Sequence, residues 1–139
     1  MTDQLTIAMA QINQRVGDLS GNAAAMLAWR AKAPGADLIV FPEQQLIGYP
    51  AEDLVLKPVF AAKAAAQLAE LALATADGGP AMLVGSIFAD NGALYNGIAL
   101  LDGQPIPAEI AREIAEQHGA QAVGTEPAFS GVATLQASF

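Results

Sequence analysis

The chain has 139 residues, a formal net charge of -8, 53% hydrophobic and 14% charged residues, and no cysteine. A chain of this length and apolar content folds as one globular domain, which excludes a disordered or low-complexity protein. The shortage of Lys and Arg argues against binding to nucleic acid or to an anionic membrane surface. The lack of cysteine excludes disulfides, thiolate metal sites and thiol catalysis.

The first sixty residues predict alternating strands and helices. Within residues 5–11, large apolar side chains alternate with small ones. This pattern is typical of an inner strand that is covered on both faces. The spacing of Leu19, Ala23 and Met26 predicts an amphipathic helix that ends before Pro34. The continuous apolar run within 37–41 predicts a second buried strand.

The next stretch predicts a helix followed by a hairpin. Pro58 is placed as the first residue of a helix whose apolar residues share one face. Residues 81–88 and 93–101 predict two strands joined by a tight turn of the primed type at 90–92. The shared helix face consists of Phe60, Ala64, Leu68 and Leu71.

The sequence pattern changes after Gly103. We expect a helix that begins near Pro107, a short strand at 120–124, and a loop or ragged end over 125–139. The whole order of elements predicts an α/β fold with a mixed sheet. No apolar run reaches the length of a membrane span, because Lys63, Gln67 and Glu70 interrupt the stretch 60–76, and the N-terminus lacks the basic region of a secretory signal. We therefore expect a soluble, cytoplasmic protein.

Glu43 is the leading candidate for chemistry. It follows a buried strand and Pro42, and the loop after a strand is where open α/β sheets usually place their sites. Partial burial at such a place would tune a carboxylate toward use as a general base. The plainer interpretation is a loop carboxylate that bonds to nearby amides.

Four segments resemble a known family. VGDLSGN at 16–22, GADLIVFPE at 35–43, GYPAEDLVLKP at 48–58 and LYNGIALLDG at 94–103 are similar to the amino-terminal glutaminase domain of glutamine-dependent NAD synthetase, a branch of the carbon-nitrogen hydrolase, or nitrilase, superfamily. The resemblance covers residues 1–103. It implies a partial nitrilase-like α-β-β-α sandwich, with residues 104–139 as a divergent helix-strand tail of unknown origin.

The resemblance also implies roles for individual residues. The family uses a Glu-Lys-Cys triad that releases ammonia from glutamine, and FPE places the general base on Glu43. Tyr49, in the GYP turn, would lie near the glutamine pocket, although packing against the following helix is an equal alternative. The family lysine follows the hairpin, but the last lysine of this chain is Lys63 and the chain has no cysteine. We therefore expect the chain alone to be inactive as a glutaminase.

Cofactors are not expected in this chain. It has no P-loop and no dinucleotide-binding glycine motif, so ATP and deamido-NAD would belong to a missing synthetase domain. The single histidine, His118, gives no basis for a metal site. Glu52 and Asp53 have an ordinary interpretation as acidic residues at a helix start.

Two further interpretations remain open. The chain is alternatively a non-catalytic interaction protein on half a nitrilase scaffold, in which an apolar sheet face pairs with a second copy or a partner chain. A weaker third possibility is a hydrolase of small amides, which the GYP and EDL segments disfavour.

Overall fold

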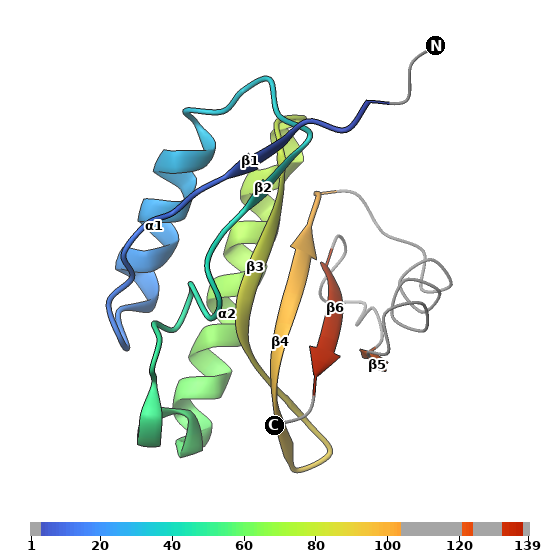
Figure 1. Ribbon diagram of the computed structural model, residues 1–139. Coiled ribbons are helices and arrows are strands. Elements are labelled where there is room, and N and C mark those ends of the chain that lie inside the picture. Colours follow the sequence, from blue (N-terminus) through green and yellow to red (C-terminus); the bar gives the residue numbers. More distant parts are fainter. Residues whose placement is uncertain (1–3, 104–120, 124–131, 138–139) are drawn as a thin grey trace.

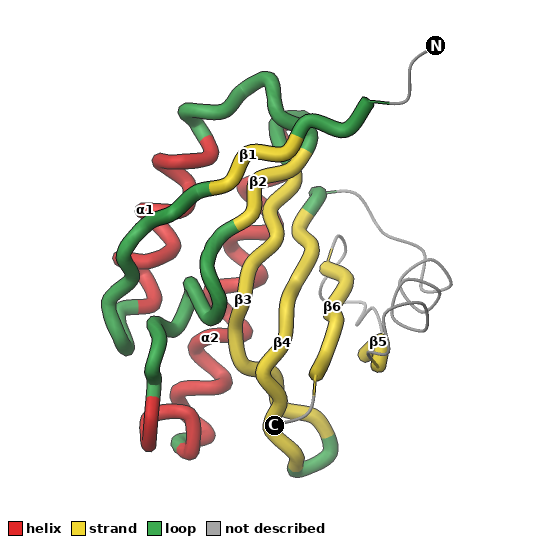
Figure 2. Tube along the Cα trace, in the orientation of Figure 1, coloured by secondary structure: helices red, strands yellow, loops and turns green. Residues whose placement is uncertain are grey.

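The computed structural model describes residues 4–103, 121–123 and 132–137. These residues form one mixed sheet with two α-helices against one of its faces (Figures 1 and 2). Along the chain the elements are β1 (Ile7–Met9), α1 (Leu19–Arg30), β2 (Leu38–Val40), η1 (Glu52–Leu56), α2 (Pro58–Ala74), η2 (Thr75–Asp77), β3 (Ala81–Asp90), β4 (Ala93–Leu101), β5 (Gln121–Val123) and β6 (Val132–Ala137).

The order of strands across the sheet is β1-β2-β3-β4-β6-β5. β1, β2 and β3 are parallel, with α1 and α2 as their connections, and the pairs β3 with β4, β4 with β6 and β6 with β5 are antiparallel. The β3–β4 hairpin turns through Asn91 and Gly92, both with positive φ, as a primed turn requires. The predicted α/β class, mixed sheet and hairpin are confirmed.

The main core lies between the sheet and the two helices. Ile39 of β2 and Met82 of β3 pair in register and are buried together, so they face the helices from neighbouring strands. The helix face predicted from the sequence is confirmed, since all four of its residues are buried. The buried cluster also contains Met26 of α1, Leu71 of α2, and Ala99 and Leu101 of β4.

The opposite side of the sheet is apolar and only partly covered by described residues. In register, Met9, Val40, Leu83 and Leu100 form one row across β1 to β4, and none of the four is fully buried. Figure 1 shows α1 and α2 behind the sheet from this side. We call this surface the open face; its residues are Ile7, Met9, Leu38, Val40, Leu83, Ile98 and Leu100.

Two predictions about strands were wrong. β1 is an edge strand rather than an inner one, because it pairs only with β2 in the described sheet and leaves Ile7 and Met9 exposed. The alternating pattern of β1 therefore does not indicate whether the strand has one neighbour or two. Residues 132–137, expected in a loop or ragged end, form β6, which pairs with β4. The short strand at 120–124 is confirmed as β5, and the helix expected from Pro107 lies outside the described residues.

The stretch Pro58–Asp77 is long and apolar enough to cross a membrane by length and composition alone. The expectation that no apolar stretch reaches the length of a membrane span is thus wrong for α2 together with η2. In this fold one face of α2 packs in the core. Phe60, Ala64, Leu68 and Leu71 turn toward the sheet, and Lys63 and Glu70 lie exposed on the other side. Packing within the domain therefore explains the apolar residues on one face of α2, while Val59 and Leu73 remain exposed.

Candidate functional site at the end of β2

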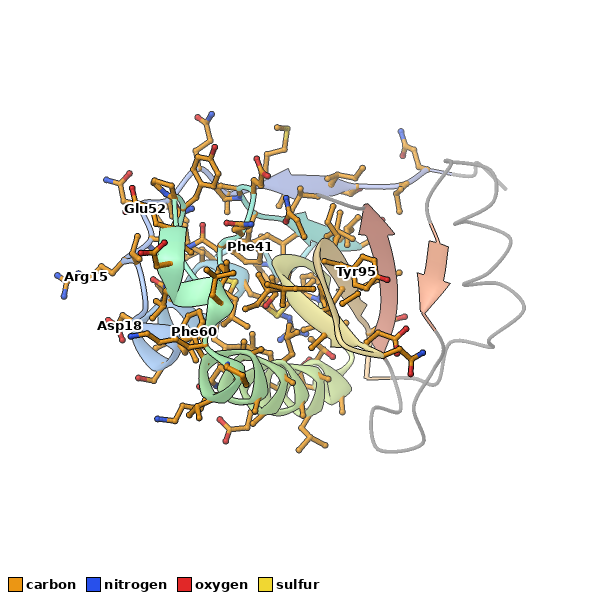
Figure 3. All side chains as sticks on the ribbon, turned by 90° about the horizontal axis from the view of Figure 1, so that it is seen from below. Arg15, Asp18, Phe41, Glu52, Phe60 and Tyr95 are labelled. Carbon is orange, nitrogen blue, oxygen red and sulfur yellow. The ribbon has the colours of Figure 1, made fainter. Side chains whose placement is uncertain are left out.

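The segment after β2 changes from buried to exposed within three residues. Phe41 lies in the interior (Figure 3), Pro42 is half-buried, and Glu43 is exposed. The chain then turns tightly, because the amide of Gln45 donates to the carbonyl of Pro42 at 3.2 Å and the amide of Gly48 donates to the carbonyl of Gln44 at 2.9 Å. The loop predicted to carry the site is thus compact.

Gly85 of β3 allows this loop to lie directly against the sheet. A Cβ at Gly85 would come within 2.5 Å of the amide nitrogen of Gln44, closer than real side chains permit. The amide of Leu46 donates to the carbonyl of Gly85 at 3.2 Å, so the loop rejoins the ladder there. Gln44 itself has a φ of 50°, which is strained for a residue with a side chain.

Asn96 of β4 binds the side chain of Glu43. Its Nδ2 donates a hydrogen bond of 2.8 Å to Oε1 of Glu43. The Nε2 of Gln14 donates at 3.2 Å to the main-chain carbonyl of Glu43 from the segment after β1. Strand alternation puts Asn96 on the same side of β4 as Ile98 and Leu100. The carboxylate of Glu43 therefore lies at the margin of the open face.

Tyr49 stands apart from this contact. The residue is 59% exposed, and no hydrogen bond joins it to Glu43 among the described residues. Glu52 and Asp53 begin η1, which has no side-chain cap, and both are exposed. In Figure 3, the labels of Glu52 and Arg15 both lie on the side of the view away from Tyr95. A role of Tyr49 in substrate binding stays a prediction.

Sequence reasoning missed two buried polar side chains, one within this loop and one on β3 beside it. Gln45 and Ser86 are both fully buried, and neither the amide atoms of Gln45 nor the hydroxyl of Ser86 has a hydrogen-bond partner among the described residues. Leaving such groups unpaired costs about 1–3 kcal/mol each. The available signal was the polar pair Gln44-Gln45, which directly follows a buried strand.

The described residues contain no group of three or more His, Asp or Glu side chains that could hold a metal ion. The chemistry at this position therefore rests on one carboxylate and its amide partner. A carboxylate held in this way can accept a proton from a neighbouring group, but it cannot by itself attack a carbonyl carbon as the cysteine of a triad does.

Comparison with known proteins places these features in a family. Residues 6–131 match the carbon-nitrogen hydrolase family. A glutamine-dependent NAD(+) synthetase from Rhodobacter capsulatus is 47% identical over 109 residues, which are 76% of this chain and 20% of that protein. The chain thus spans about a fifth of the length of this curated relative.

Solved structures agree. A glutamine-dependent NAD(+) synthetase from Cytophaga hutchinsonii aligns with a TM-score of 0.65 and 26% identity, over 70% of this chain and 17% of that one. The enzyme from Acinetobacter baumannii, solved with ADP, aligns with a TM-score of 0.58 and 37% identity, over 72% of this chain and 19% of that one. The expected nitrilase-like fold is confirmed, and the chain belongs to the carbon-nitrogen hydrolase family.

Proposed function

We propose that this chain is the N-terminal part of the glutamine amidohydrolase domain of a glutamine-dependent NAD synthetase. In that role, glutamine is the substrate, and its ammonia serves the amidation of deamido-NAD in a separate ATP-dependent domain. The observation that carries the proposal is the placement of Glu43, which follows a buried strand in an FPE element and is fixed by Asn96. The identity to the Rhodobacter capsulatus synthetase supports the choice of branch.

Glu43 supplies the general base in this proposal. In the complete domain its carboxylate would receive the proton of the attacking thiol, which this chain lacks, and proton transfer requires that the two groups meet at hydrogen-bond distance. The loop geometry supports such a role, because Gly85 brings the main chain onto the sheet and Gln14 holds the carbonyl of Glu43. Tyr49 is proposed to border the glutamine pocket from the same loop.

The chain alone is proposed to be inactive. It has no cysteine to form the thioester with glutamine and no lysine after Lys63 to stabilise the charged intermediate. Loss of the nucleophile removes the covalent step, so only binding and charge stabilisation survive. No cofactor is assigned to this chain, because the nucleotides act in the synthetase domain.

A chimera tests the proposal. Residues 1–103 of this chain replace the matching segment of the Rhodobacter capsulatus synthetase, which supplies the lysine, the cysteine and the synthetase domain. We expect NAD formation with glutamine, its loss in Glu43→Gln, and continued NAD formation by that variant when ammonium is added directly. Glu70→Gln, which alters an exposed carboxylate on α2, should retain the use of glutamine. Unchanged use of glutamine by the Glu43→Gln chimera would contradict the proposal.

A second candidate function rests on the open face. Its row of Met9, Val40, Leu83 and Leu100 is apolar, and contiguous apolar surfaces of this kind mark association sites. We propose that the chain, when it is not joined to further polypeptide, pairs through this face with a second copy as a soluble cytoplasmic homo-oligomer. Sedimentation of the purified chain tests this non-catalytic role, because a dimer supports it and a free monomer contradicts it.

A further inference from the structure

The side chain of Glu43 needs its own restraint. The main chain around it is held by the turn from Pro42 to Gly48, by the contact with Gly85 and by Gln14. These contacts fix the Cα of Glu43, but an exposed glutamate still rotates about three side-chain bonds. A general base acts efficiently only when it is held in one geometry, since a misplacement of about 1 Å can cost a hundredfold in rate.

Asn96 supplies that restraint from a rigid position. It lies within β4, where its backbone pairs with Ile87 on one side and with Ala137 on the other. β4 is an inner strand of the sheet, and groups on inner strands are placed more accurately than groups on loops. The 2.8 Å bond therefore connects the loop carboxylate to a strand that is paired on both sides.

The chemistry of the pair suits a positioning role. An ionised carboxylate only accepts hydrogen bonds, so the amide of Asn96 must present its NH₂ group to Glu43. The bond occupies Oε1, and among the described residues no donor is assigned to Oε2. An asparagine adds no charge, so it orients the carboxylate without forming an ion pair with it.

We infer that Asn96 is a positioning residue for Glu43, which holds Oε1 so that Oε2 is presented for proton transfer at the margin of the open face. This inference rests on the proposed function for its catalytic meaning, while the bond itself does not depend on it. Asn96 belongs to the LYNG segment of the hairpin. The hydrogen bond to Glu43 thus gives a physical reason for an asparagine at this position of the strand.

Nuclear magnetic resonance on the isotope-labelled chain tests the inference. In the wild-type chain we expect contacts between the side-chain amide protons of Asn96 and the γ protons of Glu43, one side-chain conformer for Glu43, and slower solvent exchange for Asn96 than for Asn91 in the exposed turn. Asn96→Ala should leave Glu43 averaging over several conformers. Glu43→Ala should abolish the protection of Asn96, whereas Glu43→Gln, which keeps an acceptor oxygen, should restore it.

A purely structural role of Asn96 predicts different results. In that case Glu43 would keep one conformer in Asn96→Ala, or Asn96 would stay protected in Glu43→Ala, and either result overturns the inference. Backbone amide signals of β3 and β4 confirm that each variant is folded. The resonance experiment uses no glutamine, so its outcome is independent of the proposed function. If the chimera hydrolyses glutamine while Glu43 moves freely in this chain, only the positioning role is rejected. An inactive chimera with the bond intact would reject only the proposed function.

Discussion

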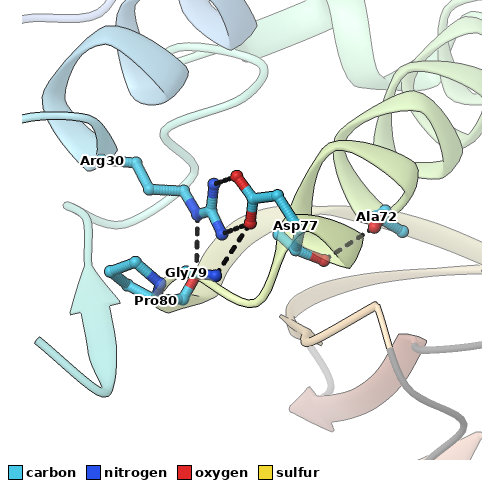
Figure 4. Close-up of polar contacts among 6 residues, drawn as sticks. Arg30, Ala72, Asp77, Gly79 and Pro80 are labelled. Carbon is cyan, nitrogen blue, oxygen red and sulfur yellow. Dashed lines mark hydrogen bonds and ion pairs between the residues drawn. The ribbon is translucent and has the colours of Figure 1, made fainter. Parts of the chain in front are cut away.

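Arg30 of α1 donates two hydrogen bonds to the carboxylate of Asp77, at 2.9 and 2.6 Å, and a third, at 2.7 Å, to the carbonyl of Pro80 (Figure 4). The guanidinium is buried, while the carboxylate is 58% exposed. The amide of Gly79 adds a further bond to Asp77 at 2.9 Å. These contacts tie α1 to the turn that leads from α2 into β3, and so they fix the helices on the sheet.

The Arg30–Asp77 pair predicts a pH dependence of stability. Hydrogen bonds from the Arg30 side chain, then from the amide of Gly79, hold the pKa of Asp77 far below its usual value of 3.8. A pKa lowered in the folded state gives stability that is complete above 3.8 and is lost as the pH falls toward the lower folded-state value. Asp77→Asn should therefore lower the urea midpoint at neutral pH, and the difference from wild type should shrink below pH 3.8.

Asp53→Asn serves as the control, since Asp53 is an exposed carboxylate of η1. Its urea midpoint should follow that of the wild-type chain across the same pH range. A constant difference between wild type and Asp77→Asn down to strongly acidic pH would contradict the pair's role.

Gly85→Ala should destabilise the chain and disturb the candidate site. The new Cβ would meet the main chain of Gln44 at 2.5 Å, and backbone cannot move aside as a flexible side chain does. Overpacking of this kind costs about 1–3 kcal/mol. Gly35→Ala is the matched control, because no atom lies within 4 Å of its Cβ. Urea unfolding measures both; equal stabilities would show that the loop does not lie on Gly85.

Two leucines of α2 test whether this apolar helix is a core element. Leu71 is 1% exposed and Leu73 is 76% exposed. Leu71→Ala should lower the free energy of unfolding by about 2–5 kcal/mol, because it removes buried methyl groups and leaves a cavity. Leu73→Ala should change it by no more than about 0.5 kcal/mol. Similar losses for the two variants would contradict the packing of α2.

The open face predicts self-association of the isolated chain. Met9→Lys and Ile98→Lys should shift the chain from dimer to monomer in sedimentation velocity, because a charge must then be desolvated in the interface. Leu73→Lys, which places the same charge on the exposed side of α2, should leave the dimer intact. A wild-type chain that is monomeric and unfolds cooperatively would exclude pairing through this face.

Local patterns predicted most elements of the fold. Pro58 begins α2, and apolar residues at every fourth position from Phe60 to Leu68 indicate its buried side. Both signals could be predicted because they depend only on residues close together in the chain. The edge position of β1 and the pairing of β6 depend on contacts between residues far apart in the chain. Apolar alternation reports which sides of a strand favour burial, and it does not report which strands lie beside it.

The candidate site was only partly predictable for the same reason. The preceding strand, Pro42 and the FPE motif indicate Glu43 as the candidate residue, and all three signals lie next to it in the sequence. The partners of Glu43 come from distant segments: Gln14 follows β1, Gly85 lies in β3, and Asn96 lies in β4. Nothing in the residues next to Asn96 or Gly85 indicates that these positions meet the loop.

Ammonia release from glutamine by the purified chain tests the central claim most directly. We expect none above the background given by the heat-denatured chain, because Glu43 has neither the cysteine nor the later lysine to work with. The Glu43→Gln variant should give the same background. Turnover by the wild-type chain that disappears in Glu43→Gln would contradict the claim, since it would show that this chain contains a complete amidohydrolase site.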